Sequence, residues 1–380
     1  MPGKSFRIAR VAGIPVGVHP LWLVIVALIT ASLGGSYFPD AVPGIDPGAA
    51  YGLGLLSALL LFASVLAHEF GHALVARRHG VEVVEIDLWL LGGVARMRGA
   101  PTHAGDELRY ALAGPAVTLA IAIVFGAAAI ALPTSAPEAV RAVVSYQALV
   151  NAAILAFNLM PAFPLDGGRV ARALLWRRNG DLVVATQQAA KAGRAFGYGL
   201  VGLGALSALG GAAGGLWFVV IGDFLLLASK AEAQGTELES TFAGTTAREL
   251  MATPAVCIPA TQPVEQALSG HFATERFTSY PVVTPSGEVV GMVALDSVVA
   301  VPPADGTAVT VGDVMETDPR LLVGPDQDMV ELVEDPGFNR FGRAVVVDEA
   351  RHALGVVSVT DVRRALRVAQ VTRARAAVTA

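Results

Sequence analysis

The chain has few charged residues for its length. Only 16% of its 380 residues are charged while 54% are hydrophobic, whereas about a quarter of the residues in soluble domains are charged. This deficit excludes a protein that is soluble throughout, and we expect an integral membrane protein with a polar appendage. The formal net charge of −5 provides no basic excess, so we expect no nucleic-acid partner.

Cysteine is almost absent, since Cys257 is the single one. One thiol excludes an internal disulfide framework and a zinc site built from several cysteines. We expect Cys257 to act as a small hydrophobic side chain in a soluble core. The N-terminus lacks the pattern of a cleavable signal peptide, because Arg7, Arg10 and several glycines interrupt its apolar residues. Membrane insertion is therefore expected to use the first spanning helix.

One stretch inside a long apolar run carries His68, Glu69 and His72. Side chains four residues apart share a helix face, so the two histidines can bind one ion, and Glu69 beside it can accept a proton from water. The pattern also arises by chance. However, a charged group at mid-membrane costs about 2.5–3.5 kcal/mol on insertion scales, and ionisable residues there are usually functional. The stretch predicts a zinc peptidase site in a membrane.

Six apolar runs predict six transmembrane helices. The loop after the first run has no Lys or Arg, whereas the second run ends in Arg77 and Arg78. By the positive-inside rule, His68 and His72 lie toward the cytoplasmic side, and both termini are cytoplasmic. We therefore expect a multi-pass protein of the cell (plasma) membrane. The predicted spans are residues 21–33, 53–75, 110–132, 140–159, 195–209 and 216–228.

Two segments are too short or too polar to span a membrane and have strand character. Residues 6–18 alternate loosely, which predicts short strands or irregular chain at the membrane face. Residues 81–97 predict a pair of strands, with Gly92 and Gly93 at the hairpin turn. Two interpretations remain open for this pair. It either enters the membrane beside the histidines or forms an ordinary interfacial hairpin.

A second polar stretch follows the fourth predicted span, at residues 158–169. Pro161 and Pro164 break the helix at membrane depth, where irregular backbone is tolerated only against protein or a water-filled cavity. Asp166 is thus a carboxylate presented at a helix break. An Asp-Gly pair alone would indicate an ordinary turn. Catalytic zinc commonly takes two histidines and one carboxylate, so Asp166 is the best third ligand beside His68 and His72.

From residue 245 the composition becomes that of a soluble domain with an internal repeat. Met251 recurs as Met315 and Gly291 as Gly355, so the two units are 64 residues apart. Each unit is predicted to contain a strand, a helix, two strands and a helix. The expected domains are 1–230 in the membrane, a polar linker at 231–244, repeats at 245–302 and 309–370, and a flexible tail at 371–380.

Three stretches together resemble the site-2 protease family of intramembrane zinc metalloproteases. They are residues 68–72, Gly92-Gly93, and residues 158–168, and the resemblance covers roughly residues 6–230. The repeat is similar to a tandem pair of cystathionine-β-synthase (CBS) domains, which one branch of that family carries. The implied fold is a polytopic α-helical membrane protein of about six transmembrane helices with small membrane-associated β elements. A soluble α/β CBS pair follows it.

The resemblance implies one Zn²⁺ per chain, held by His68, His72 and Asp166, with Glu69 as the catalytic acid and base. The implied activity is cleavage of transmembrane segments of membrane proteins, as in regulated intramembrane proteolysis. The substrates of bacterial relatives lead us to expect a signalling membrane protein such as an anti-sigma factor.

The same resemblance points to residues that bind the substrate. Asn158 is expected to help hold the substrate backbone, with an interhelical hydrogen bond as an equal alternative. Gly92 and Gly93 are included because residues 81–97 can offer a strand edge to an extended substrate segment.

CBS pairs bind adenine nucleotides in clefts between the repeats. The second repeat has the glycine-to-aspartate stretch of the ribose contact, with Ser358 and Asp361, but the first has Ala294 and Ser297 at the matching positions. The resemblance therefore implies one competent cleft, in a cytoplasmic CBS pair that regulates the protease and forms a homodimer. A dimerisation module without a ligand is the alternative.

Two other functional classes remain to be weighed. A CBS-gated transporter or channel would also place polar residues within the membrane, but it needs no carboxylate near two histidines. Asp166 therefore favours the peptidase. A catalytically inactive scaffold is disfavoured because Glu69 is intact.

Overall fold

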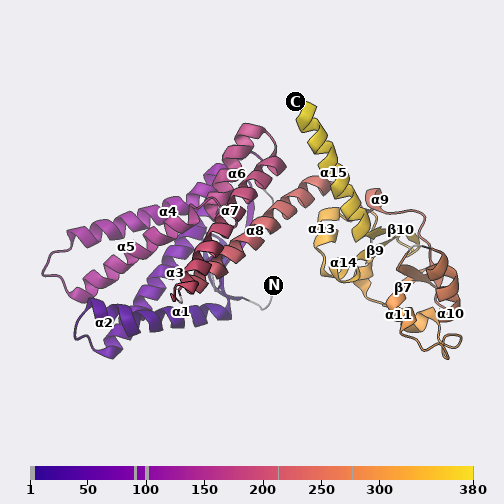
Figure 1. The fold of residues 1–380 in the computed structure, drawn as a ribbon, viewed down its shortest axis with the longest axis horizontal. Coiled ribbons are helices and arrows are strands. Elements are labelled where there is room, and N and C mark those ends of the chain that lie inside the picture. The colour runs from indigo at the N-terminus through magenta and orange to yellow at the C-terminus, as the bar shows by residue number, and fades with distance from the viewer. Residues whose placement is uncertain (1–4, 90–91, 99–101, 213, 276, 380) are drawn as a thin grey trace. The chain divides into compact units, whose positions relative to one another are not determined.

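The computed structural model describes residues 5–89, 92–98, 102–212, 214–275 and 277–379. The chain divides into two compact units, Met1–Gln234 and Gly235–Ala380. The first unit is mainly helical with one small sheet, and the second contains two small sheets, several short helices and one long C-terminal helix (Figure 1). This agrees with the predicted fold class of a helical membrane domain followed by a soluble α/β repeat pair.

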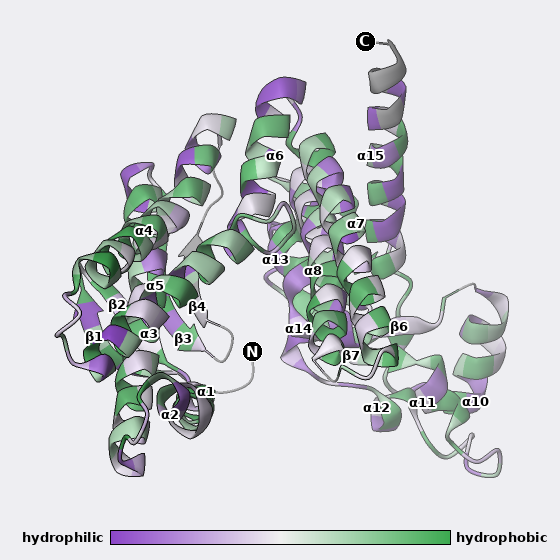
Figure 2. Cartoon of the chain, turned by 60° about the vertical axis from the view of Figure 1, so that its left-hand side comes forward, coloured by the Kyte–Doolittle hydropathy of each residue, from purple (hydrophilic) through white to green (hydrophobic). Residues whose placement is uncertain are grey.

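Four helical segments of the first unit are long and apolar enough to cross a membrane, and they contain the first four predicted spans except for the last residue of the third and of the fourth. Much of their surface is hydrophobic in Figure 2, and Leu23, Ile130 and Leu149 are 63%, 88% and 70% exposed. Such side chains are suited to face lipid tails. The four segments are Pro20–Ala41 (α1, a π-helical turn at Leu33–Tyr37, and α2), Pro47–Arg78 (α3), Ala104–Ala131 (α4) and Glu138–Asn158 (α5).

The predicted fifth and sixth spans lie within α7 (Leu182–Leu209) and α8 (Gly215–Phe242). In the described part of the chain, neither helix is among those long and apolar enough to cross a membrane. Six spans are therefore not confirmed. Large apolar residues of α7 and α8 are nevertheless exposed, with Leu203 and Leu206 at 64% and 69%.

Helix α3 carries the histidine pair and has clear signals at both ends. The Asp46 carboxylate accepts a hydrogen bond from the Ala49 amide at 3.1 Å, and Pro47 occupies the first helical turn. The helix ends before Gly80, which has a φ of +82°. Gly71 lets α4 approach closely, since a Cβ there would lie 2.8 Å from the Ala113 carbonyl oxygen.

The sheet of the first unit has four strands in sequence order, β1 (Phe6–Val11), β2 (Ile14–Val18), β3 (Glu82–Trp89) and β4 (Gly92–Arg98). β2 runs parallel to β3, and the other two pairs are antiparallel. The strands predicted at 6–18 and 81–97 are confirmed. In the described part of the chain, β4 forms one edge of this sheet and β1 the other.

The predicted turn at Gly92 and Gly93 is wrong. Gly92 pairs with Trp89 and Gly93 with Leu88, so both glycines are the first residues of β4. The pair was misassigned because glycines are frequent in tight turns, but they also occur in strands where another group approaches the backbone closely. Residues 90 and 91 lie outside the described residues.

The proline-rich stretch separates two helices, as predicted. α5 ends at Asn158, residues 159–165 are irregular, and α6 (Asp166–Asn179) begins at the aspartate. Gly167 and Gly168 let the irregular segment pack on the first turn of α6. A Cβ on Gly167 would lie 2.3 Å from the Leu159 carbonyl oxygen, and one on Gly168 would lie 2.8 Å from the Ala162 backbone.

The second unit contains the predicted repeat. Each repeat has a three-stranded sheet with one parallel and one antiparallel pair. Each sheet packs on its own buried apolar core. The strands are β5 (Ile258–Pro259), β6 (Ser279–Val283), β7 (Val289–Ala294), β8 (Leu322–Val323), β9 (Arg343–Val347) and β10 (Ala353–Ser358). The helices are α9 (Ala247–Leu250), α10 (Val264–Ala267), α11 (Leu295–Val299), α12 (Val311–Val314), α13 (Met329–Glu334), α14 (Pro336–Phe341) and α15 (Val359–Thr379), with a π-helical turn at Leu268–Phe272 and a 3₁₀ turn at Pro319–Leu321.

The segments predicted from composition as a polar linker and a flexible tail are helical. The linker predicted at 231–244 is the end of α8, and Phe242 is buried with Ala247 and Met329 in the core of the second repeat. The tail predicted at 371–380 belongs to α15 up to Thr379. Cys257 is half-buried in the second unit, and this burial raises the pKa of its thiol, which favours the unreactive protonated form.

Candidate active site

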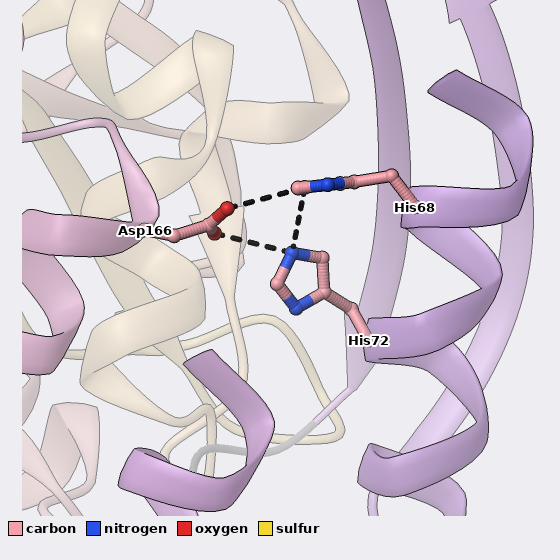
Figure 3. A group of neighbouring side chains, drawn as sticks. All are labelled: His68, His72 and Asp166. Carbon is pink, nitrogen blue, oxygen red and sulfur yellow. Dashed lines mark hydrogen bonds and ion pairs between the residues drawn. The ribbon is translucent and has the colours of Figure 1, made fainter. Parts of the chain in front are cut away.

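Three predicted ligands lie together although they come from helices far apart in sequence. Asp166 Oδ2 lies 3.1 Å from His68 Nε2, and Asp166 Oδ1 lies 3.1 Å from His72 Nε2 (Figure 3). The two Nε2 atoms are also 3.1 Å apart. Both histidines are buried, at 6% and 4% exposure. In the described part of the chain, this is the one cluster of His, Cys, Asp and Glu whose potential metal-ligand atoms all lie within 4.8 Å of one another.

The other ring nitrogens of the histidines are held by α4. His72 Nδ1 donates to the Tyr110 carbonyl oxygen at 2.8 Å, and His68 Nδ1 is hydrogen-bonded to Thr118 Oγ1 at 2.8 Å. A carbonyl only accepts, so His72 carries its proton on Nδ1 when neutral, leaving the Nε2 lone pair directed at the cluster. Partners of this kind orient metal-binding histidines and fix their tautomer. The donor set is therefore prepared to bind a cation.

Gly114 keeps the space beside the imidazoles open. A Cβ at this position would lie 2.3 Å from His72 Nε2 and 2.6 Å from His68 Nε2. A site that excludes even a methyl group at its ligand atoms, with two imidazoles and one carboxylate, matches the ligand set of catalytic zinc with a position left for water. The residues present fit this metal.

Sequence reasoning missed the contribution of α4. Tyr110, Gly114 and Thr118 are four residues apart and therefore share one helix face. That spacing was a signal, because small and polar residues on one face of an apolar helix mark the side that packs against another helix.

Glu69 adjoins β4. It is half-buried, and a Cβ on Gly93 would lie 2.3 Å from Glu69 Cγ. Gly93 therefore gives the Glu69 side chain room at the edge of the sheet. Gly92 has a φ of +138° and open space around it. The strand edge predicted for substrate binding thus lies beside the predicted catalytic carboxylate.

Asn158 is the last residue of α5 and is half-buried. The structure places it at the start of the irregular segment that leads to Asp166. Its two predicted roles, substrate contact and interhelical hydrogen bond, both stay predictions.

The predicted nucleotide contacts in the second repeat lie next to each other. Ser358 ends β10 and Asp361 lies in the first turn of α15. The Ser358 amide and hydroxyl both donate to Asp361 Oδ2, at 3.0 and 2.6 Å. Serine and aspartate here cap the helix, so a ribose would have to take over or share these hydrogen bonds.

The fold and the site define a class of protein: a helical membrane protein with a buried zinc-type hydrolase centre, followed by two CBS-like repeats. The model of peptidase family M50 matches residues 56–139 and 126–200, and that of the CBS domain matches residues 247–303 and 311–368. The chain is 37% identical to Rip3 of Mycobacterium tuberculosis, whose name describes it as a putative zinc metalloprotease. The match covers 94% of this chain and 92% of Rip3.

A sequence match and a solved structure from Methanocaldococcus jannaschii are also similar. A zinc metalloprotease is 28% identical over 94% of this chain and 95% of its own length. The solved structure of a site-2 protease is 27% identical, with a TM-score of 0.41, over 60% of this chain and 95% of that chain. The chain belongs to peptidase family M50, the site-2 proteases, and is a zinc metalloprotease of the site-2 type with a tandem CBS pair.

Proposed function

We propose that this protease is a zinc-dependent intramembrane endopeptidase that cleaves transmembrane segments of membrane proteins near the cytoplasmic face. The observation that carries the proposal is the convergence of Asp166 with His68 and His72 beside Glu69, where the histidines and Glu69 lie on α3, one of the helices apolar enough to span a membrane. A hydrolytic centre on such helices suits a substrate that is itself in the membrane. Anti-sigma factors and other signalling membrane proteins are the substrate class that we expect.

The residues of the chain divide the chemistry among them. Zinc, when bound, supplies a Lewis acid that activates water for attack on the scissile carbonyl. His68, His72 and Asp166 would hold the zinc ion. The hydrogen bonds to Tyr110 and Thr118 keep the two imidazole rings oriented toward it. The Glu69 carboxylate accepts a proton from the attacking water and delivers it to the leaving amine.

The substrate must also become extended, because a helix hides its carbonyl groups in its own hydrogen bonds. We propose that the edge of β4 accepts the unwound segment as an added strand. Its position beside Glu69 supports this, since an added strand would place its backbone near the catalytic carboxylate.

Proline tests the role of the strand edge because it has no amide hydrogen for a strand partner. Inserting a proline between Ala95 and Arg96 in β4 should reduce cleavage at least tenfold and leave the zinc content unchanged. The matched control is Ile8→Pro in β1, at the opposite edge of the same sheet, which should retain most of the activity. Cleavage by the β4 variant at the wild-type rate would refute the role of this edge.

For the orientation, we propose that both termini and the CBS pair lie in the cytoplasm and that the protein is in the cell membrane. Arg77 and Arg78 at the end of α3, with no Lys or Arg in residues 34–52, support this. The histidines lie within the last three turns of α3, and would thus be near the cytoplasmic surface.

We further propose that the CBS pair binds one adenine nucleotide through Ser358 and Asp361, forms a homodimer and regulates cleavage. The fragment to test has to begin at residue 235, because Phe242 is part of the core of the second repeat. Calorimetry of residues 235–379 with AMP, ADP and ATP should show heat that Asp361→Ala removes.

The chain supplies a matched control for this experiment. Ser297 in the first repeat occupies the position that matches Asp361 in the second. Ser297→Ala should therefore leave the binding heat unchanged. The absence of heat with all three nucleotides would refute the nucleotide proposal. Light scattering of the same fragment should give twice the monomer mass, and a monomer mass would refute the homodimer.

A further inference from the structure

A buried ion cluster lies on the side of α6 that packs against α4 and α8. Arg172 of α6 donates from Nε to Glu107 Oε1 on α4 at 2.6 Å, and from Nη1 to Glu232 Oε1 on α8 at 2.7 Å. The side chains of Arg172 and Glu107 are 8% and 1% exposed, and that of Glu232 is 27% exposed. One guanidinium on α6 therefore joins this helix to α4 and α8.

Arg172 also contacts the segment that precedes Asp166. Its guanidinium carbon lies 5.3 Å from the centre of the Phe163 ring, and Phe163 is fully buried. Ser229 of α8 donates to the Phe163 carbonyl oxygen at 3.3 Å. Arg172 and α8 thus hold the chain on both sides of Asp166, in the irregular segment before it and in α6 after it.

The contact on α4 is close to the histidine site. Glu107 lies one turn before Tyr110, whose carbonyl oxygen accepts the hydrogen bond from His72. The contact between Arg172 and Glu107 therefore joins α6, which carries Asp166, to α4, which orients His72. Relative movement of α4 and α6 would separate Asp166 from His72.

Fold stability alone does not explain such a cluster. Burying charges carries a large desolvation penalty, and apolar residues of similar volume are often as stabilising as a buried ion pair. Hydrogen bonds between charged groups are strongly directional, however, and a guanidinium can bind two carboxylates in fixed geometry. What the cluster adds over an apolar contact is a defined position of α6.

We propose that Arg172 is a positioning residue for the metal centre, which holds Asp166 within ligand distance of His68 and His72. Glu232 makes this position depend on α8, which continues to Phe242 in the core of the second repeat. The proposal rests on the proposed zinc site, but its test does not need cleavage.

The test measures how fast the purified full-length protein loses zinc to a chromophoric chelator. Loss of a side chain that hydrogen-bonds a metal ligand typically lowers metal affinity by 10- to 100-fold. Arg172 acts one contact further from the ligands, so Arg172→Met should speed zinc dissociation about tenfold, the lower end of that range. Arg172→Lys, which keeps the charge but cannot bridge two carboxylates in the same way, should have a smaller effect. Glu232→Gln should also speed dissociation. Arg178→Met, at an exposed position of the same helix, is the matched control and should not.

A second measurement separates positioning from general destabilisation. In the metal-free protein, hydrogen exchange at the first turn of α6 should rise in Arg172→Lys and Glu232→Gln, while exchange in α5 stays as in the wild type. The proposal is overturned if Arg172→Met and Glu232→Gln release zinc at the wild-type rate. It is also overturned if hydrogen exchange in the variants rises equally in all helices. Faster zinc release in the Arg172 and Glu232 variants than in the wild type and Arg178→Met supports the proposal even if the protein cleaves no substrate. A lack of cleavage would count only against the proposed function.

Discussion

Replacing Glu69 by Gln is expected to leave the zinc content unchanged and to lower the cleavage rate by about 10²- to 10⁴-fold, the usual contribution of a general acid and base. The amide has nearly the same shape as the carboxylate, so it fits the space that Gly93 leaves. It cannot take up the proton from water. Glu69 is not part of the ligand cluster, so the variant should still bind one zinc per chain.

The measurement uses the purified protein in detergent with a transmembrane substrate, and mass spectrometry of the products. Zinc is measured in the same preparation. Glu138→Gln, an exposed glutamate at the start of α5, is the matched control and should cleave normally. Glu69→Gln activity equal to that of the wild type would exclude the mechanism. Comparing the membrane proteomes of cells with the active protein and with Glu69→Gln would identify the substrates.

Replacing Gly114 by Ala is expected to abolish zinc binding and cleavage together, although Gly114 is not a ligand. The added methyl group would lie 2.3 Å from His72 Nε2 and 2.6 Å from His68 Nε2, too close for the ligand atoms to keep their positions. His68→Ala, which removes one ligand, is the reference for complete loss. Both variants should fall from about one zinc per chain to near none, measured by elemental analysis.

Helix α4 offers a matched control for the Gly114 prediction. Gly126 lies on the same helix and has open space around it, so Gly126→Ala should retain zinc and activity. Alanine is more favourable than glycine in a helix by about 1 kcal/mol, so neither change should weaken α4 itself. If Gly114→Ala keeps a full equivalent of zinc, the arrangement of the site described here is wrong.

The histidine pair illustrates what local sequence can predict. A spacing of four positions on one helix places the side chains of His68 and His72 on the same face, and the apolar run around them predicts the helix. The CBS repeat could also be predicted from local sequence, because the 64-residue period and the pattern of strands can be read directly from the chain. Composition was a poorer guide to local order. The polar segment before the repeat is the end of α8, where Leu238 and Phe242, four residues apart, pack on the core of the second repeat.

The partners of the histidines illustrate what local sequence cannot predict. Asp166 could be proposed as the third ligand from zinc chemistry. The 3.1 Å distances from its carboxylate oxygens to His68 Nε2 and His72 Nε2 depend, however, on how α6 packs against α3 and α4. Gly93 was assigned to a turn because paired glycines are a turn signal, and local sequence could not reveal Glu69, its neighbour in space, which lies 24 positions earlier. The cluster around Arg172 was not predicted at all, since its three charges come from three helices.

By itself the sequence determined the class of the protein, the membrane helices around the histidine pair, the repeat and the chemistry of the candidate ligands. These follow from residue type and from spacing along one helix or strand, where covalent geometry sets the distances. Only the tertiary structure decided that Gly114 opens the site, that α4 orients both imidazoles and that β4 borders Glu69. Those features depend on distances between separate elements, which the packing of side chains sets after the elements have formed.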